Sequence, residues 1–268
     1  MEASRAPLLE LEEISVRIGD VRALANLNAF VRKGERVAIV GPEHAGKTTV
    51  LHSIIGRCIP YTGAVRHNGN TITNQKPADR AHLGIATVAR QSELFDSQSV
   101  LANLTIGRHR LMRGGFLRGM LYWVGGARRE EVSHRIAVEE ILAFLGLENI
   151  RNEKAGTLSQ YDRRRVDIGR AMAMQAEILL IDEPMAELNP EEEAEITRIL
   201  IALNEQKGMT IVMAARNLAP VANIAQRVMV LHQGRNIAEG SPEEIKGSEA
   251  VQRAYQEAVD AVRTLQTS

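Results

Sequence analysis

The order of hydrophobic and polar residues along the 268-residue chain predicts an α/β protein. Short apolar runs bounded by turn residues are typical of buried strands, whereas apolar residues spaced three or four apart are typical of helices. The first part of the chain predicts strands at 8–18 and 21–31, which we expect to pair antiparallel, and at 36–40, 64–67 and 84–88. The last part predicts strands at 178–181, 210–213 and 227–231, separated by helices at 190–205 and 218–225. Strands that alternate with helices favour a parallel sheet at the centre of the fold.

The region from about 92 to 165 interrupts this alternation, and its apolar spacing is helical over 99–107, 129–147 and the start of 157–174. We therefore expect a helical subdomain inserted into the α/β core. Residues 242–268 predict C-terminal helices. The chain has no internal repeat and no low-complexity tract, so we expect 1–268 to form one domain with these parts.

A phosphate-binding loop is predicted between the strand at 36–40 and a helix at 48–57. The sequence GPEHAGKT has the spacing G-x-x-x-x-G-K-[ST], in which backbone N–H groups and the helix N-terminus bind phosphate oxygens. Lys47 is expected to reach the outer phosphates, and the Thr48 hydroxyl to bind Mg²⁺. A chance glycine-lysine turn is the alternative, which the strand before the loop and the helix after it disfavour. The residues expected to contact nucleotide here are Gly41, Pro42, Glu43, His44, Ala45, Gly46, Lys47, Thr48 and Thr49.

Two carboxylates, Asp182 and Glu183, follow the buried strand at 178–181 and precede Pro184. Because side chains alternate across a strand, the two acids can have different roles. Asp182 suits a position near Mg²⁺, and Glu183 suits a general base that polarises an attacking water. The alternative is an acidic turn that caps the next helix. An apolar strand ending in Asp-Glu-Pro after a phosphate loop disfavours that interpretation.

These motifs, with Thr157-Leu158-Ser159 at the start of a predicted helix, resemble the ATPase subunits of ATP-binding-cassette (ABC) transporters. The similarity extends from about Leu8 to Glu244. Three further features are similar to the ATPases of branched-chain amino acid importers. They are Gly84-Ile85-Ala86 with Leu94-Phe95 after it, an arginine-rich insert over 107–131, and Ala186-Glu-Leu-Asn-Pro190.

The resemblance implies a P-loop NTPase fold with a RecA-like mixed sheet core, an N-terminal antiparallel β subdomain and an inserted helical subdomain. It implies ATP and Mg²⁺ as cofactors, with Thr48, Asp182 and Gln91 near the metal. Two cassettes would form a homo- or heterodimer head to tail, so that Ser159 reaches the partner's γ-phosphate. ATP hydrolysis would drive uptake through separate transmembrane permease subunits. The chain would be peripheral, at the cytoplasmic face of the inner or plasma membrane.

The chain departs from the family pattern at several nucleotide contacts. Tyr161 occupies a glycine position of the signature motif, and Arg216 aligns with a histidine that contacts the γ-phosphate. Glu43 and His44 replace the usual asparagine and glycine. Arg90 stands in register with the expected glutamine, with Gln91 one place late, and Ile18 replaces the aromatic residue that stacks on adenine.

These departures have opposite implications for binding and for turnover. A phenol ring at Tyr161 opposes close backbone approach to an anion. Arginine is a good phosphate ligand but not a neutral donor and acceptor, although a surface arginine that begins a helix is an equal alternative for Arg216. Intact Lys47 and Glu183 favour an active ATPase. A catalytically weak or inactive nucleotide-binding scaffold of a transporter assembly is therefore the alternative function.

Composition restricts the remaining possibilities. Acidic and basic residues balance at 33 each, which disfavours a nucleic-acid partner, and the single Cys58 excludes a disulfide framework. No uncharged apolar run reaches membrane-spanning length and the start lacks a signal-peptide pattern, so we expect a cytoplasmic protein. Arginines and aromatic residues between 108 and 135 are candidates for a partner surface. The transported substrate is not encoded in these motifs.

Overall fold

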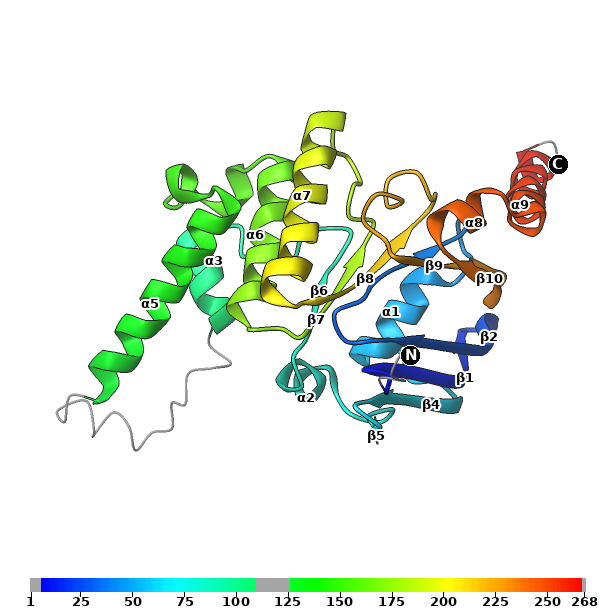
Figure 1. Ribbon diagram of the computed structural model, residues 1–268, viewed down its shortest axis with the longest axis horizontal. Coiled ribbons are helices and arrows are strands. Elements are labelled where there is room, and N and C mark those ends of the chain that lie inside the picture. The colour runs from blue at the N-terminus through cyan, green and yellow to red at the C-terminus, as the bar shows by residue number, and fades with distance from the viewer. Residues whose placement is uncertain (1–5, 109–125, 267–268) are drawn as a thin grey trace, which may run out of the picture.

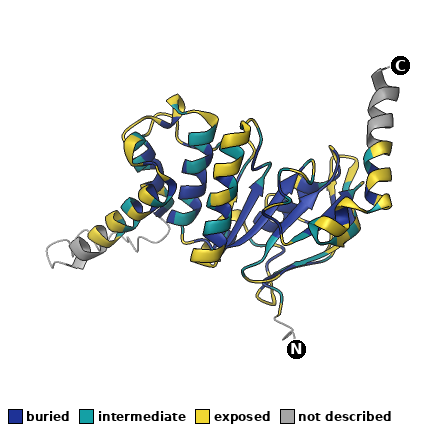
Figure 2. Ribbon diagram, turned by 45° about the horizontal axis from the view of Figure 1, so that its top comes forward, coloured by how far each residue is buried: buried dark blue, intermediate teal, exposed yellow. Residues whose placement is uncertain are grey.

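The computed structural model describes residues 6–108 and 126–266, and the side chains of 6–108 and 132–257. Two β-sheets with their helices form one end of the described structure, and helices α3, α5 and α6 form the other (Figure 1). Most of the predicted cluster of arginines and aromatic residues lies outside the described residues. Figure 2 shows buried residues concentrated in the strands and on the inner faces of the helices.

The core sheet has six strands in the order β10-β9-β3-β8-β7-β6. Neighbouring strands from β9 to β6 pair parallel, which confirms the prediction of a parallel sheet, and β10 pairs antiparallel with β9. The strands are β3 (Arg36–Val40), β6 (Ile85–Val88), β7 (Ile178–Asp182), β8 (Thr210–Ala215), β9 (Arg227–His232) and β10 (Arg235–Gly240).

Strand β10 was not predicted, because its residues alternate between exposed and half-buried positions and its apolar signal is weak. The sequence signal for this strand was the Gln233-Gly234 turn that precedes it. In the structure both residues have positive φ, 46° and 73°, which is the backbone of a two-residue hairpin connection.

Alternation along the core strands separates two hydrophobic clusters. Val37 and Ile39 of β3 pack with α1 (Lys47–Ile55) and the N-terminal strands, whereas Ala38 and Val40 pack on the opposite face with the helical part. Because a strand presents alternate residues to opposite faces, an uninterrupted apolar run is what a sheet covered on both sides requires.

The N-terminal sheet is antiparallel, with the order β2-β1-β4-β5. Its strands are β1 (Leu9–Ile18), β2 (Val21–Val31), β4 (Thr62–His67) and β5 (Asn70–Thr71). The register Leu9 to Val31 and Ile18 to Val21 confirms the predicted antiparallel pair. Helix α1 lies between this sheet and the core sheet (Figure 1), so both sheets position the helix that follows the phosphate loop.

The inserted part contains α3 (Val100–Gly107), α5 (Gly126–Leu145), two 3₁₀ turns (Glu148–Ile150 and Ala155–Thr157) and the start of α6 (Gln160–Ala173). The three helices pack closely at Gly169 of α6. A Cβ there would lie 2.6 Å from Leu104 Cδ2 and 2.9 Å from Leu145 Cδ1, so a larger residue would require both leucine side chains to shift. The antiparallel sheet, the mixed core sheet and the inserted helices together confirm the predicted fold class.

The remaining helices are α2 (Pro77–His82), α7 (Pro190–Lys207), α8 (Pro242–Lys246) and α9 (Glu249–Gln266). Capping boxes start α7 at Asn189 and α8 at Ser241, and proline follows each cap. The prediction of a helix at 218–225 was wrong. This segment forms successive turns, because Pro220 lacks an N–H donor and disfavours helical backbone at the residue before it.

Candidate functional site

Three neighbouring strands of the core sheet end at the same edge and bring three chain segments together. Strand β8 lies between β3 and β7, and all three are parallel. Val40 is in register with Ala215, and Asp182 is in register with Ala214. The phosphate loop after β3, the turn after β8 and the acidic turn after β7 therefore meet at the carboxyl edge, where open parallel sheets bind ligands.

The phosphate loop has a backbone that requires glycine at Gly46. Gly46 has φ 104°, and a Cβ there would lie 2.7 Å from the carbonyl oxygen of Ala23 and 2.8 Å from the Leu24 side chain. The loop thus packs directly on β2, and α1 begins at the next residue. His44 also has positive φ, 61°, without being glycine. A tightly turned loop followed by a helix N-terminus fits phosphate oxygens.

The Lys47 ammonium lies inside this loop. Its Nζ donates to the carbonyl oxygens of Gly41 and Pro42, each 2.8 Å away, and the residue is only 7% exposed. Burial lowers the pKa of Lys47, while the carboxylates of Glu183 and Asp182 act in the opposite direction. The loop therefore holds a buried cation next to two acids.

Thr48 and Asp182 are in direct contact, as Thr48 Oγ1 donates to Asp182 Oδ2 at 2.8 Å. One hydroxyl and one carboxylate fit Mg²⁺, which in nucleotide sites takes few protein ligands and the rest from phosphates and water. Among the described side chains, no three or more His, Cys, Asp or Glu residues form a metal-binding group. Gln91 is exposed in the loop after β6.

Glu183 and Arg216 are adjacent at the edge of the sheet. The Glu183 side chain is 17% exposed, and burial raises its pKa, whereas Lys47 and Arg216 lower it. Arg216 Nε lies 3.6 Å from Glu183 Oε1, and Arg216 Nη1 lies 2.7 Å from Glu43 Oε1. The Tyr255 hydroxyl of α9 donates to the Arg216 carbonyl at 2.7 Å. Sequence reasoning missed Tyr255, since no local motif links it to a turn 39 residues earlier.

The signature segment lies in the helical part rather than in this cluster. Ser159 is the N-cap of α6, where its hydroxyl accepts from the Asp162 N–H at 3.1 Å and donates to Asp162 Oδ2 at 2.8 Å. The Arg165 guanidinium lies 4.4 Å from the centre of the Tyr161 ring and also pairs with Asp162. The only hydroxyl proton of Ser159 is therefore used within its own helix.

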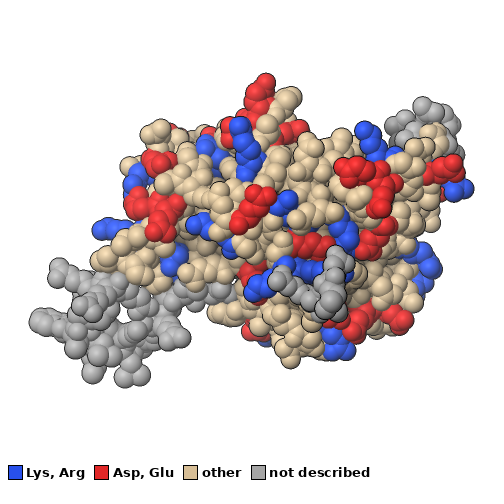
Figure 3. Space-filling view, in the orientation of Figure 1, with Lys and Arg blue, Asp and Glu red and all other residues tan. Residues whose placement is uncertain are grey.

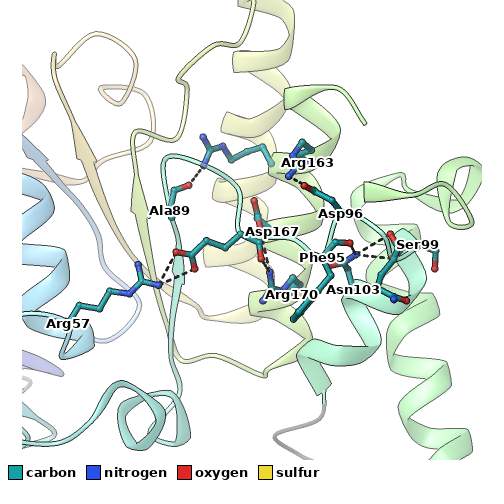
Figure 4. A network of polar contacts seen from close by, with 12 residues as sticks. Arg57, Ala89, Phe95, Asp96, Ser99, Asn103, Arg163, Asp167 and Arg170 are labelled. Carbon is teal, nitrogen blue, oxygen red and sulfur yellow. Dashed lines mark hydrogen bonds and ion pairs between the residues drawn. The ribbon is translucent and has the colours of Figure 1, made fainter. Parts of the chain in front are cut away.

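A second polar cluster, which the sequence did not predict, lies where α6 approaches α1, α2 and β6 (Figure 4). Arg57 Nη2 lies 2.9 and 3.0 Å from the two Glu93 carboxylate oxygens, and Arg170 Nη1 donates to the Glu93 carbonyl at 2.7 Å. These residues line a groove of about 220 Å³. The Asp167 side chain, which also lines it, is 8% exposed, and burial raises its pKa.

Comparison with known proteins identifies the family. A sequence profile described as ABC transporter matches residues 24–186. The chain belongs to this family. The high-affinity branched-chain amino acid transport ATP-binding protein LivG of Salmonella typhimurium is 32% identical over 250 residues, which cover 93% of this chain and 97% of LivG. The energy-coupling factor transporter ATP-binding protein EcfA of Methanoculleus marisnigri is 31% identical over 240 residues, 89% of this chain and 80% of EcfA.

Solved cassettes share the fold. MJ1267, an ATP-binding cassette of an ABC transporter in its ADP conformation, has a TM-score of 0.80 at 28% identity, covering 93% of this chain and 98% of MJ1267. The dimeric MJ0796 cassette bound to ADP and phosphate has a TM-score of 0.72 at 26% identity, covering 87% of this chain and 98% of MJ0796. The chain is thus an ABC-type ATPase. None of its described helices is long and apolar enough to cross a bilayer.

Proposed function

We propose that this cassette binds and hydrolyses ATP to drive an importer of branched-chain or related amino acids. The observation that carries the proposal is the Thr48–Asp182 hydrogen bond beside the buried Lys47 ammonium. It joins the phosphate loop to the acidic turn in one cluster, which is the arrangement that phosphoryl-transfer chemistry needs.

Each residue of the cluster has a proposed role. The backbone from Gly41 to Thr49 holds the phosphates, and Lys47 moves from the loop carbonyls to the outer phosphates. Mg²⁺, held by Thr48 and Asp182, would neutralise phosphate charge. Glu183 accepts a proton from the attacking water, and its raised pKa makes it a better base than a solvated carboxylate. Gln91 stays a proposed metal contact that has to move inward from its exposed loop.

The importer requires further subunits. Cassettes of this family dimerise, as in the MJ0796 structure, and we propose that Ser159 faces the γ-phosphate of a second cassette.

The groove around Arg57, Glu93 and Asp167 fits a charged segment of a transmembrane permease subunit, because it combines a buried carboxylate with exposed charges. These proposed contacts with a permease would hold the chain peripherally at the cytoplasmic face of the membrane. In Figure 3 basic and acidic side chains are interspersed over the visible face, without a continuous basic stripe across it.

The substrate class rests on similarity. LivG and EcfA have comparable identity to this chain but serve different transporters by name. LivG covers more of the chain and of its own length, which favours branched-chain or related amino acids.

The first test is a titration of the purified chain with MgATP, beside Lys47→Ala and the matched control Lys33→Ala. Lys33 is exposed and precedes β3, at the opposite edge of the sheet from the phosphate loop. We expect saturable binding by the wild type and the control, and its loss in Lys47→Ala. No binding by the wild type at millimolar ATP would contradict the proposal.

A nucleotide-binding scaffold is the second candidate, and the Ser159–Asp162 contact favours it. Because the Ser159 hydroxyl is already satisfied within α6, closure on a partner's nucleotide requires these bonds to rearrange. ATP binding without turnover, in the presence of the cognate permease and partner cassette, would favour the scaffold. Turnover that Glu183→Gln abolishes would favour the enzyme.

A further inference from the structure

Glu43 and Arg216 meet at the mouth of the phosphate loop. Arg216 Nη1 lies 2.7 Å from Glu43 Oε1, and Arg216 Nε lies 3.6 Å from Glu183 Oε1. One guanidinium therefore lies between two carboxylates that follow different strands, β3 and β7. The sheet order produces this placement, since Arg216 directly follows β8, the strand between them.

The backbone of Arg216 is held by helix α9, because its carbonyl accepts a hydrogen bond from the Tyr255 hydroxyl at 2.7 Å. The Arg216 side chain is 43% exposed, yet it makes two charged contacts inside the site. These contacts direct its charge towards the loop, unlike that of a freely solvated surface arginine.

The charges around the loop show what the pair can do. Lys47 and Arg216 are positive, whereas Glu43, Asp182 and Glu183 are negative, and ATP adds several negative charges. An uncompensated carboxylate about 8 Å from a phosphate charge, at an effective dielectric near 20, weakens binding roughly thirtyfold. A guanidinium 2.7 Å from that carboxylate removes most of this repulsion.

We propose that Arg216 is the charge partner of Glu43, so that the net charge of this pair sets the affinity of the phosphate loop for ATP. Each departure from the family pattern thus compensates for the other. This inference rests on the proposed function, because it requires ATP to occupy the phosphate loop.

The test measures the dissociation constant for MgATP in four chains at one fixed ionic strength. These are the wild type, Glu43→Gln, Arg216→Gln and the double variant. We expect Arg216→Gln to weaken ATP binding about thirtyfold, because it leaves the negative charge of Glu43 uncompensated. We expect Glu43→Gln to tighten ATP binding about tenfold, because it leaves the positive charge of Arg216 free to attract the phosphates. The double variant should return to within about threefold of the wild type, because two neutral glutamines have the same net charge as the ion pair.

The conservative variant Arg216→Lys separates charge from shape. It keeps the positive charge but loses the planar fork, so its ATP affinity should stay within about threefold of the wild type. Thermal unfolding of each chain confirms that it is folded. The matched control is the exposed Glu195–Arg198 pair of α7, whose Gln variants should leave ATP affinity unchanged.

Three results would overturn the inference. Wild-type affinity in Arg216→Gln would show that Arg216 is a surface residue. An unchanged Glu43→Gln chain, with a double variant as weak as Arg216→Gln, would show that Arg216 acts on the phosphates alone. Weak binding by Arg216→Lys would show that charge compensation is not its role. Failure of the proposed function is distinct, because there the wild type itself would not bind ATP.

Discussion

The Ser159 hydroxyl donates a hydrogen bond to the Asp162 carboxylate, 2.8 Å away, at the N-terminus of α6. This helix end is the one proposed to face the γ-phosphate of a partner cassette. The helix dipole attracts anions there, whereas the Asp162 charge occupies the same position and opposes them. Arg165, which pairs with Asp162 and stacks on Tyr161, holds this arrangement in place.

Asp162→Asn should therefore strengthen ATP-dependent dimerisation. The amide oxygen still accepts the Ser159 hydrogen bond, but the negative charge is gone. In a Glu183→Gln background, which blocks hydrolysis, we expect the dimer dissociation constant with ATP to fall about tenfold, by the Coulomb estimate for one charge. Analytical ultracentrifugation with and without ATP measures it. Asp96→Asn, an exposed acid of the same part, is the control, and an equal effect there would contradict the explanation.

Tyr255→Phe tests the contact between α9 and the turn that carries Arg216. Loss of the hydroxyl leaves the Arg216 carbonyl without this donor and should lower the free energy of unfolding by about 1 kcal/mol. Urea unfolding at pH 8 measures the change, with the exposed Tyr61→Phe as a control. A wild-type midpoint in Tyr255→Phe would show that the contact contributes nothing.

The Tyr255 phenol also makes the stability of the wild type depend on pH. Burial, and secondarily the Glu183 charge, raises the pKa of Tyr255 to about 12 from the value of 10.0 in the unfolded chain. The folded state therefore keeps the phenol proton at a pH where the unfolded state has lost it. The resulting stability is present below pH 10 and is lost as the pH rises towards 12. The wild type should thus lose stability over this window more steeply than Tyr255→Phe, which has no such proton.

Arg80→Met should be strongly destabilising. The Arg80 side chain is 1% exposed and donates to the carbonyl oxygens of Ser53, Ile54, Thr73 and Gln75, so it satisfies the end of α1 and the loop before α2. Methionine fills similar volume but leaves these acceptors unpaired, which costs about 3 kcal/mol. Thermal unfolding measures the loss. Arg57→Met, at an exposed ion pair, should change stability by less than about 1 kcal/mol, and equal effects would show that burial is not the cause.

Glu35→Gln should reduce stability in a pH-dependent way. Arg227 pairs with both Glu35 oxygens, at 2.6 and 2.9 Å, and donates to the Phe30 carbonyl, which ties β9 to β2. Burial alone would raise the pKa of Glu35, but the hydrogen bonds from Arg227 and from the Arg32 N–H hold it below 4.5. At pH 7 we expect a loss of about 2 kcal/mol, because the buried Arg227 guanidinium loses one of its two charged partners and keeps only Glu239.

The sign of this linkage fixes the pH profile. A carboxyl whose pKa is lower in the folded state contributes stability above its unfolded pKa of 4.5, and this stability disappears as the pH falls through the folded pKa. The difference between wild type and Glu35→Gln should therefore shrink on acidification. Denaturant unfolding from pH 7 down to about 3 tests it, with the exposed Glu205→Gln as the control. A constant difference at every pH would rule out ionisation of Glu35 as the source.

Local patterns predicted most of the fold because they describe local physics. Continuous apolar runs identified β3, β7 and β8, since only strands covered on both faces bury every residue. Apolar spacing gave a wrong prediction at 218–225. Buried Val221 and Ile224 are three residues apart, as on one face of a helix, but the segment folds as turns. Strand β10 was missed because an edge strand with alternating exposure has little apolar signal.

The sequence by itself determined the phosphate loop, the acidic turn and their order along the chain. Residue type and spacing are sufficient to identify a phosphate-binding loop and the end of a buried strand. Only the tertiary structure decided which departures interact. The adjacency of β3, β8 and β7 places Arg216 between Glu43 and Glu183, and the return of α9 brings Tyr255 to the same turn. Glu43 and Arg216 are 173 positions apart in the chain, and the strand order that brings them together is a property of the packed sheet that no local pattern encodes.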